Sequence, residues 1–375
     1  MLIGIDGNEA NVDNRVGVGQ YAYNLLLNLY KLDKKNKYII YLKEEPNSDL
    51  PKEKANWQYK IIKPKKLWSR FALPLHFLIF GKKLDLFFSP NHYSPLFCPC
   101  PIIPTIHDLG YLKFKKQFTR KDLHQLVNWT KQSLKKAAHI IAVSNFSKNE
   151  LIKTYQIDPN KINIAYNGVS SPPKLTSKQE KAVLKKFKLK ENNYLLYLGT
   201  LKPNKNIPFL IKSFSLFYKK ELIKSNYQKN FKLVIAGKKG WLFKEIFSTV
   251  KKEKMIDHIV FTDYINDTQK WSLYKNAIAT LLPSTYEGFG IPAIESMKIG
   301  TPVIASNIPP LKEILEDTAI FIDPHNQEDF CHKMTRITNP KTRQEYSQLG
   351  RKQANKFTWQ NTAKSVLKTF QKFNS

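Results

Sequence analysis

Short runs of apolar residues recur along the chain and alternate with longer stretches in which apolar residues follow helical spacing. Apolar runs of this length are typical of strands buried on both faces, and strands separated by helices predict βαβ units around a parallel sheet. In the first half the strand candidates are residues 2–5, 38–42, 84–88, 102–106 and 140–143. In the second half they are residues 194–198, 233–236, 259–261, 279–282, 302–305 and 319–322. The pattern therefore predicts two α/β halves.

The two halves meet at residues 167–173, where a glycine, two serines and two prolines cannot continue either a helix or a strand. We expect one domain over residues 1–170 and a second over residues 171–356. Residues 357–375 have helical spacing and no following strand, which predicts a helix that crosses back toward the first domain. Open α/β sheets bind ligands at the carboxyl ends of their strands, so the loops after the strand candidates are where chemistry is expected.

The chain is strongly basic, with 61 Lys and Arg against 30 Asp and Glu and a formal net charge of +31 at pH 7. Such an excess fits polyanionic partners, namely nucleic acid, an anionic membrane face or phosphorylated small molecules. Lysines dispersed over solvated surfaces are the alternative explanation, and charge alone does not decide. With 42% hydrophobic and 24% charged residues over 375 positions, the composition is globular and excludes wholesale disorder.

Metal-ligand spacing, a disulfide framework and a membrane span are not apparent in the sequence. Cys98 and Cys100 flank a proline without a second pair, and Cys331 stands alone. The apolar run from Phe71 to Phe80 is interrupted by Pro74 and is shorter than the ~20 residues of a span. The chain begins with a strand-like run and shows no signal peptide. We expect a cytoplasmic protein with reduced thiols, no metal and no cofactor.

The segment after the strand candidate at residues 279–282 carries the clearest chemistry. It reads PSTYEGFGIPAIE from Pro283 to Glu295 and predicts a glycine-containing loop that enters a helix near Pro292. A helix N-terminus with exposed loop amides is an anion site of the kind that binds phosphate. Glu287 in the loop and Glu295 in the helix can accept hydrogen bonds from ribose or sugar hydroxyls. For Glu295, simple complementation of the helix dipole is the alternative.

Two further loops follow strand candidates in the second half. GTLKPNKN begins at Gly199 and includes Lys205, whose positive charge can neutralise a diphosphate. A solvated surface lysine is the alternative. GKKG after residues 233–236 includes Lys238 and repeats the pattern more weakly, so it does not differ from an ordinary basic turn.

In the first half, His107 and Asp108 directly follow the strand candidate at residues 102–106. This histidine either projects toward a ligand or is a hydrogen-bonded structural residue. Gly17 and Gly19 stand in GVGQYA, a formal match to the G-x-G-x-x-A motif of dinucleotide-binding domains. That motif follows its strand directly, whereas ten residues separate Gly17 from Asp6. The loop is better suited to bring backbone close to a phosphate or a sugar.

Residues 59–88 interleave basic and aromatic side chains, among them Lys63, Lys65, Lys66, Arg70, Lys82 and Lys83 beside Trp68, Phe71 and Leu73. This composition suits an anionic membrane surface. A core helix with lysines on its wet side, leading into the strand candidate at residues 84–88, is the alternative.

Taken together, these segments resemble a known family. Glu287 and Glu295, with seven residues between them, resemble the E-x7-E signature of retaining glycosyltransferases of family 4. The resemblance covers nearly the whole chain, through HD at 107–108, VSNFS at 143–147, NGV at 167–169, GTL at 199–201, KN at 205–206, GKKGW at 237–241 and GTPVIAS at 300–306. It implies the GT-B fold, in which two Rossmann-like domains with parallel sheets face each other across a cleft.

The resemblance also implies roles. The first domain would bind the acceptor and the second the nucleotide sugar, without a metal. Glu295 would bind the ribose hydroxyls, Lys205 would neutralise the diphosphate, and His107 and Glu287 would lie at the reacting centre, with Asp108 on the acceptor side. Further donor contacts would come from Gly17, Gly19, Thr200, Lys238, Gly288, Phe289, Gly290 and Ile291.

One departure concerns the donor. Many members carry an arginine where this chain has Thr200, and Lys202 or Lys238 would supply the missing charge. Members with this Gly-Thr-Leu sequence are similar to mannosyl- and rhamnosyltransferases of polysaccharide assembly.

We therefore expect a retaining, metal-independent hexosyltransferase, with mannose favoured, that transfers a sugar from a nucleotide diphosphate sugar to a glycan or a lipid-linked glycan. If the acceptor is carried on a lipid, peripheral attachment to the inner face of the plasma membrane is expected. An NAD-dependent oxidoreductase accounts only for the glycine loop. A nucleic-acid-binding protein accounts only for the charge, and the sequence has no helix-turn-helix, zinc-finger or RNP-like segment, so we expect no nucleic-acid partner.

Overall fold

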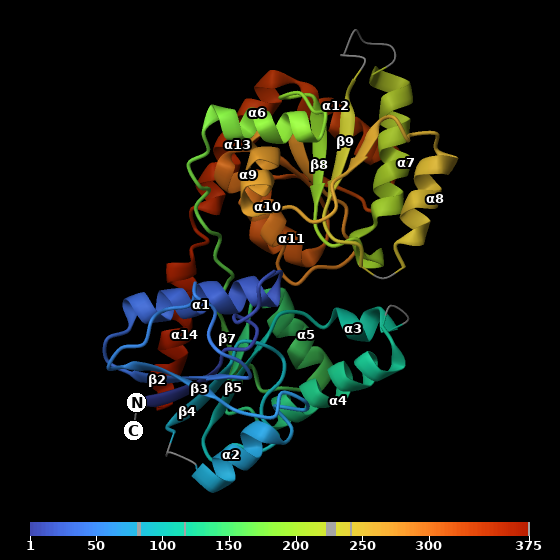
Figure 1. The fold of residues 1–375 in the computed structure, drawn as a ribbon. Helices are drawn as coiled ribbons and strands as arrows, with labels where there is room; N and C mark the ends of the chain where they lie inside the picture. The colour runs from blue at the N-terminus through green and yellow to red at the C-terminus, as the bar shows by residue number, and fades with distance from the viewer. Residues whose placement is uncertain (81–83, 116–117, 223–229, 241, 374–375) are drawn as a thin grey trace. The chain divides into compact units, whose positions relative to one another are not determined.

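The computed structural model describes residues 1–80, 84–115, 118–222, 230–240 and 242–373 (Figure 1). Lys82, Lys83 and Trp241 lie outside the described residues. The chain divides into two compact units. The N-terminal unit comprises residues 1–168 together with 357–375, and the C-terminal unit comprises residues 169–356. Each unit contains one sheet whose paired strands all run parallel, as the alternation of apolar runs and helices predicts.

The sheet of the N-terminal unit has seven strands in the order β3-β2-β1-β4-β5-β6-β7. Its strands are β1 (Leu2–Asp6), β2 (Lys37–Leu42), β3 (Trp57–Ile61), β4 (Leu86–Ser89), β5 (Ile102–Ile106), β6 (Ile140–Ala142) and β7 (Ile162–Ile164). The helices of this unit are α1 (Val18–Leu32), α2 (Ala72–Phe80), α3 (Gly110–Lys113), α4 (Arg120–Lys136), α5 (Asn145–Tyr155) and α14 (Trp359–Phe370).

Alternate residues of the central strands serve the two faces of this sheet. Ile40 and Phe88 pack toward α1 and α14, whereas Ile39 and Phe87 pack toward α2. Side chains along a strand point alternately to opposite faces, so an uninterrupted apolar run is what a sheet covered on both faces requires. The C-terminal helix α14 is part of this core, and Phe370 meets Phe88 with ring centroids 5.3 Å apart.

The close approach of α14 explains the glycine at position 168. A Cβ at Gly168 would lie 2.1 Å from the backbone nitrogen of Trp359, where α14 begins. Only glycine leaves room for this contact. Thr362 of the same helix donates a hydrogen bond to the Tyr166 carbonyl at 2.6 Å, which fixes the helix against this segment.

The sheet of the C-terminal unit has six strands in the order β10-β9-β8-β11-β12-β13. They are β8 (Tyr194–Leu198), β9 (Lys232–Ala236), β10 (Ile259–Phe261), β11 (Ala279–Leu282), β12 (Val303–Ser306) and β13 (Ile320–Ile322). The helices of this unit are α6 (Ser177–Lys186), α7 (Ile207–Phe217), α8 (Lys244–Lys252), α9 (Asp267–Asn276), α10 (Ile291–Ile299), α11 (Pro309–Leu315), α12 (Gln327–Thr338) and α13 (Pro340–Ala354). One core lies between the sheet and α7, α8 and α12.

Two features of the N-terminal unit differ from the sequence-based expectations. Strands β3 and β7, at the two edges of the sheet, were not predicted, because their residues are partly polar and partly exposed. In residues 59–88, Trp68 and Arg70 are buried, with 2% and 8% exposure, so neither can face a membrane. The Arg70 guanidinium lies 4.1 Å from the ring centroid of Trp129 and donates a hydrogen bond to Gln132.

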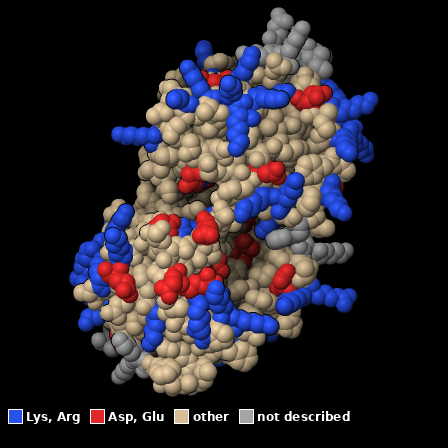
Figure 2. Space-filling view, viewed as in Figure 1, with Lys and Arg blue, Asp and Glu red and all other residues tan. Residues whose placement is uncertain are grey.

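Charged side chains are distributed over the surface. Figure 2 shows lysine and arginine side chains spread over the viewed face of each unit, with acidic side chains among them. Within the described ranges, no helix is both long enough and apolar enough to cross a bilayer.

Candidate active site

The strands β8 and β11 lie side by side where the strand order of the C-terminal unit reverses. In open α/β sheets ligands bind at this point, outside the carboxyl ends of the strands. The loops that follow the two strands are joined by hydrogen bonds. The Thr285 amide donates to the Asn204 carbonyl at 2.9 Å, and the Asn204 side-chain amide donates to the Tyr286 carbonyl at 3.2 Å. Two segments far apart in sequence thus form one surface.

Lys205 and Glu287 meet on this surface. Lys205 ends the short turn η3 (Pro203–Lys205), and its Nζ lies 2.6 Å from Oε1 of Glu287. The same carboxylate oxygen accepts a hydrogen bond from Ser284 Oγ at 2.7 Å. The side chains of Lys205 and Glu287 are 20% and 11% exposed. The structure therefore brings together the lysine and the loop carboxylate that the sequence singled out, as an ion pair with little exposed surface.

The helix α10 follows the loop near Pro292, as predicted, and glycines flank it at both ends. Gly290 has φ of +96° and Gly300 has φ of +90°, a conformation that favours glycine, and Pro292 stands in the first turn. Phe289, before the helix, is buried with 3% exposure, and Gly288 and Ile291 are half-buried. The helix N-terminus and its preceding loop thus lie directly after β11, where they face the carboxyl edge of the sheet.

Glu295, in the second turn of α10, has two partners from the preceding helix α9. Lys270 Nζ lies 2.8 Å from its Oε1, and the Tyr274 hydroxyl donates to its Oε2 at 3.2 Å. Lys270 is also 3.2 Å from Asp267. Burial lowers the pKa of Lys270, but the charges of Glu295 and Asp267 outweigh it and raise that pKa, so the lysine stays charged. Burial, together with the nearby Glu295 charge, raises the pKa of Tyr274 and keeps its hydroxyl protonated.

Lys270 and Tyr274 were missed by sequence reasoning. They are four residues apart, which places both on one face of α9. Their distance from Glu295, 25 and 21 positions along the chain, gives no local signal of the contact. Only the packing of α9 beside α10 brings the three together.

Thr200 and Lys238 lie on the loops after β8 and β9. The Leu201 amide donates to the Lys238 carbonyl at 2.9 Å, so the two loops are neighbours, while the Lys238 ammonium lies 4.6 Å from the ring centroid of Tyr264. Thr200 accepts a hydrogen bond from Tyr197 through its carbonyl at 3.3 Å. Lys202 lines a pocket of ≈ 250 Å³ beside α7 that includes neither Glu287 nor Glu295.

In the N-terminal unit, Gly17 and Gly19 begin α1 after a long loop from β1. Gly17 has φ of +49°, and a Cβ there would meet no atom within 4 Å. At Gly19, a Cβ would lie 3.0 Å from the carbonyl oxygen of Glu9. Glycine is favoured at Gly17 by its backbone conformation and at Gly19 by the close approach of the loop to the helix.

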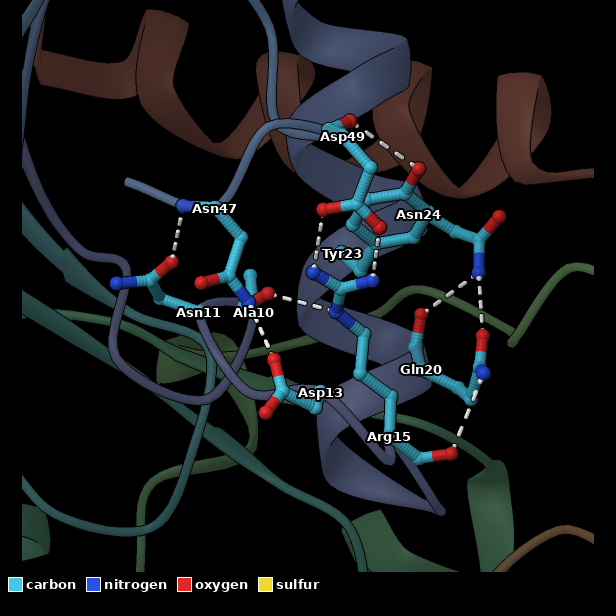
Figure 3. Close-up of polar contacts among 9 residues, drawn as sticks. All are labelled: Ala10, Asn11, Asp13, Arg15, Gln20, Tyr23, Asn24, Asn47 and Asp49. Carbon is cyan, nitrogen blue, oxygen red and sulfur yellow. Dashed lines mark hydrogen bonds and ion pairs between the residues drawn. The ribbon is translucent and has the colours of Figure 1, made fainter. Parts of the chain in front are cut away.

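Arg15 fastens this loop to the segment after β2 (Figure 3). Its guanidinium donates through Nη2 to Asp49 at 2.8 Å and through Nε to the Ala10 carbonyl at 2.7 Å. It also stacks over Tyr23, 4.0 Å from the ring centroid. The Asn47 amide donates to the side chain of Asn11 at 2.7 Å, a second tie between the segments. The glycine loop is therefore held in one conformation by residues on both sides.

His107 follows β5 and is fixed by hydrogen bonds. Its Nε2 lies 3.0 Å from the Pro90 carbonyl, which can only accept, so Nε2 carries the proton and Nδ1 is the acceptor. Its backbone amide donates to His92 Nε2 at 3.0 Å, and its ring meets Tyr21 edge-on. Burial lowers the pKa of His107, although the Pro90 carbonyl and the Asp108 charge oppose the shift. A neutral imidazole with a defined tautomer results.

Asp108 has a local structural role. Its Oδ1 accepts a hydrogen bond from the Gly110 amide at 2.8 Å, at the beginning of α3.

The Gly17 loop does not form a dinucleotide-binding motif, since eleven residues separate the end of β1 from the start of α1. Across the described part of the chain, no three His, Cys, Asp or Glu side chains gather in a way that could hold a metal ion.

Two family models match the chain. The model described as "Glycosyl transferases group 1" matches residues 178–353, and the model described as "Glycosyltransferase Family 4" matches residues 16–171. Between them they account for most of both units.

Two of the similar proteins with a described activity are O-antigen mannosyltransferases. The chain is 26% identical over 287 residues to O-antigen chain mannosyltransferase B of Escherichia coli, which covers 76% of this chain and 74% of that protein. It is 29% identical over 261 residues to O-antigen chain mannosyltransferase RfbU of Salmonella typhimurium, which covers 69% of this chain and 67% of that protein.

Solved structures share the fold over the full length. Sucrose-phosphate synthase from Thermosynechococcus elongatus matches with a TM-score of 0.75 at 17% identity, covering 99% of this chain and 98% of that one. Anabaena Alr3699/HepE, solved in complex with UDP and glucose, matches with a TM-score of 0.73 at 14% identity, covering 99% of both chains. The chain thus belongs to the GT-B glycosyltransferases of family 4, and its activity is glycosyl transfer.

Proposed function

We propose that this protein is a retaining, metal-independent hexosyltransferase that moves mannose from a nucleotide diphosphate sugar to a glycan or a lipid-linked glycan. The observation that carries the proposal is the pair of lysine–carboxylate contacts at the switch point of the C-terminal unit, Lys205 with Glu287 and Lys270 with Glu295. The mannosyltransferase relatives favour mannose, and the UDP and glucose bound to HepE favour a nucleotide sugar as donor.

The proposed donor site uses the carboxylates for hydroxyl groups and the lysine for phosphate. Glu295 accepts hydrogen bonds from the two ribose hydroxyls, and Glu287 binds a hydroxyl of the sugar beside the amides at Phe289 and Gly290. Lys205 then contacts the diphosphate. The ion pair with Glu287 places the Lys205 ammonium and partly desolvates it, which lowers the cost of orienting it toward a diphosphate.

Catalysis in this proposal rests on the leaving group. The bond between C1 of the sugar and the diphosphate oxygen breaks, and the acceptor oxygen forms the new bond on the same face of the sugar ring. The acceptor's proton passes to the departing diphosphate oxygen. Negative charge grows on the diphosphate as the bond breaks, so Lys205 and the amides at the start of α10 stabilise the transition state more than the ground state.

In this proposal the N-terminal unit binds the acceptor. His107 carries its proton on Nε2 and is neutral, so its Nδ1 can accept a hydrogen bond from a sugar hydroxyl but cannot serve as a charged acid. A cytoplasmic protein that works on lipid-linked acceptors would also require attachment to a membrane face.

The experiment is a transfer assay with purified protein, GDP-, UDP- and dTDP-sugars and a mannose-terminated oligosaccharide. We expect transfer from a mannose donor, an α-configured product by NMR from the α-linked donor, and full turnover after exhaustive treatment with EDTA. An inverted product would exclude the retaining assignment. Loss of turnover in EDTA that magnesium or manganese restores would exclude metal independence.

A further inference from the structure

The helix α2 is apolar on two opposite faces, and the described residues cover only one of them. Leu73 and Phe77 pack against Ile39, Tyr41 and Phe87 of the sheet. The other face carries Leu75, Leu78 and Ile79, and Phe71 directly precedes the helix; Phe71, Leu75, Leu78 and Ile79 are 62%, 56%, 64% and 59% exposed. Their spacing of four, three and one residues places them side by side along one stripe that faces away from the core.

The exposed stripe is larger than isolated surface apolar residues explain. Taking roughly 200 Å² for a fully exposed large apolar side chain, the four residues present roughly 500 Å² to water. Patches of this size are near the upper end for monomeric proteins and mark sites of interaction. Leu67, 48% exposed, and Phe80, 65% exposed, extend it at the two ends of the helix.

Basic residues precede this stripe in the chain. Lys63, Lys65 and Lys66 are all exposed in the segment that leads into α2. Lys65 forms a surface ion pair with Glu44, in which both side chains are more than half exposed, and Lys63 donates to the Lys43 carbonyl at 3.0 Å. Contacts this exposed contribute little to stability, so the ammonium groups can exchange them for other anions.

We propose that this face of α2, with Lys63, Lys65 and Lys66, docks the protein on an anionic lipid bilayer, with the stripe inserted among the acyl chains near the headgroups. Large apolar side chains beside lysines are the composition of interfacial helices. A second copy of the chain fits less well. The stripe offers less than the roughly 800 Å² per partner of a stable interface.

The inference extends the proposed lipid-linked acceptor, but it stands on the exposed face itself. It is tested without donor or acceptor, so a failure of the proposed transfer reaction leaves its outcome unaffected. It also differs from the interpretation of residues 59–88 from sequence, because Trp68 and Arg70 are buried and the inserted residues are Phe71, Leu75, Leu78 and Ile79.

The experiment compares two double variants with the same chemistry. Leu75→Ser/Ile79→Ser removes two apolar groups from the stripe, and Leu242→Ser/Ile256→Ser removes the same two residue types from positions 62% and 66% exposed in the C-terminal unit. Co-sedimentation uses vesicles of phosphatidylglycerol and phosphatidylcholine in equal amounts. We expect the α2 variant to lose about tenfold in vesicle partitioning and the control variant to retain it, since only the first pair leaves water on binding.

A second comparison tests whether the lysines before α2 contribute to binding. Lys65→Glu/Lys66→Glu is measured against Lys185→Glu/Lys186→Glu, a neighbouring pair of exposed lysines on α6. We expect the first variant to lose at least about tenfold, and binding of the unaltered protein to fall as salt shortens the Debye length. Equal retention of the two members of either comparison, or no binding of the unaltered protein to these vesicles, would overturn the proposal. Light scattering that shows a dimer abolished by Leu75→Ser/Ile79→Ser would replace the bilayer with a second copy.

Discussion

Glu295→Gln separates a donor-binding role for this carboxylate from a purely structural one. The substitution keeps the size of the side chain and one acceptor oxygen but removes the charge. A hydrogen bond to a charged group contributes about 1.5–3 kcal/mol, so the loss of the carboxylate from two ribose hydroxyls should weaken nucleoside diphosphate binding by roughly 10–100-fold. The assay is calorimetric titration with GDP and UDP, with the free energy of unfolding measured in urea on the same samples.

The control for this prediction comes from Lys270. In Glu295→Gln the Lys270 ammonium, 19% exposed, loses its nearest carboxylate and keeps Asp267 at 3.2 Å, so some loss of stability is expected even if Glu295 never touches ligand. Lys270→Met/Glu295→Gln also removes the ammonium that has lost its nearer carboxylate. If the carboxylate binds ribose, the double variant regains stability but not affinity. Nucleotide affinity that returns to the original value in the double variant would refute the reasoning.

Three further outcomes are expected. Gly168→Ala should destabilise the N-terminal unit by about 2–4 kcal/mol in urea unfolding, because the new Cβ collides with backbone atoms of α14 that cannot rotate away. Burial, with the nearby His107, lowers the pKa of His92 to about 3, below its ordinary value of 6.5, so the folded state resists its protonation. Stability is then complete above pH 6.5 and should fall by about 2 kcal/mol between pH 7 and pH 5, a loss that His92→Gln should reduce. Arg15→Ala should raise KM for the donor several-fold with a smaller effect on kcat, since it frees the Gly17 loop, and Arg15→Ala with an unchanged KM would remove that loop from donor binding.

The apolar pattern predicted the central strands because those strands are buried on both faces. β1 and β8 consist almost wholly of apolar residues, and burial of such a run leaves little choice of element. β3 alternates Trp57, Gln58, Tyr59 and Lys60 at the sheet edge, where one neighbour and partial exposure permit polar residues. Its identity depends on pairing with β2, which the local sequence does not encode.

The residues of the candidate site also differ in how far the sequence predicts their positions. Lys205 and Glu287 stand in the segments directly after β8 and β11, and Glu295 stands in the helix that follows β11, so their sequence positions indicate the edge of the sheet at which they lie. Lys270 and Tyr274 reach Glu295 only through the packing of two helices. Which apolar residues of α2 remain in water was also beyond the sequence, because its two faces are equally hydrophobic and only the position of the sheet distinguishes them.

The place of α14 in the N-terminal unit has a consequence for how the chain is made. Residues 169–356 are synthesised between the first strand-bearing segment and the helix that completes its core. On the ribosome the C-terminal unit is therefore a continuous segment that can fold as it emerges. The segment made earlier keeps the apolar surface of α1 uncovered until Trp359–Phe370 has been translated. Nascent chains stalled before residue 357 should bind holdase chaperones through the segment that was made first.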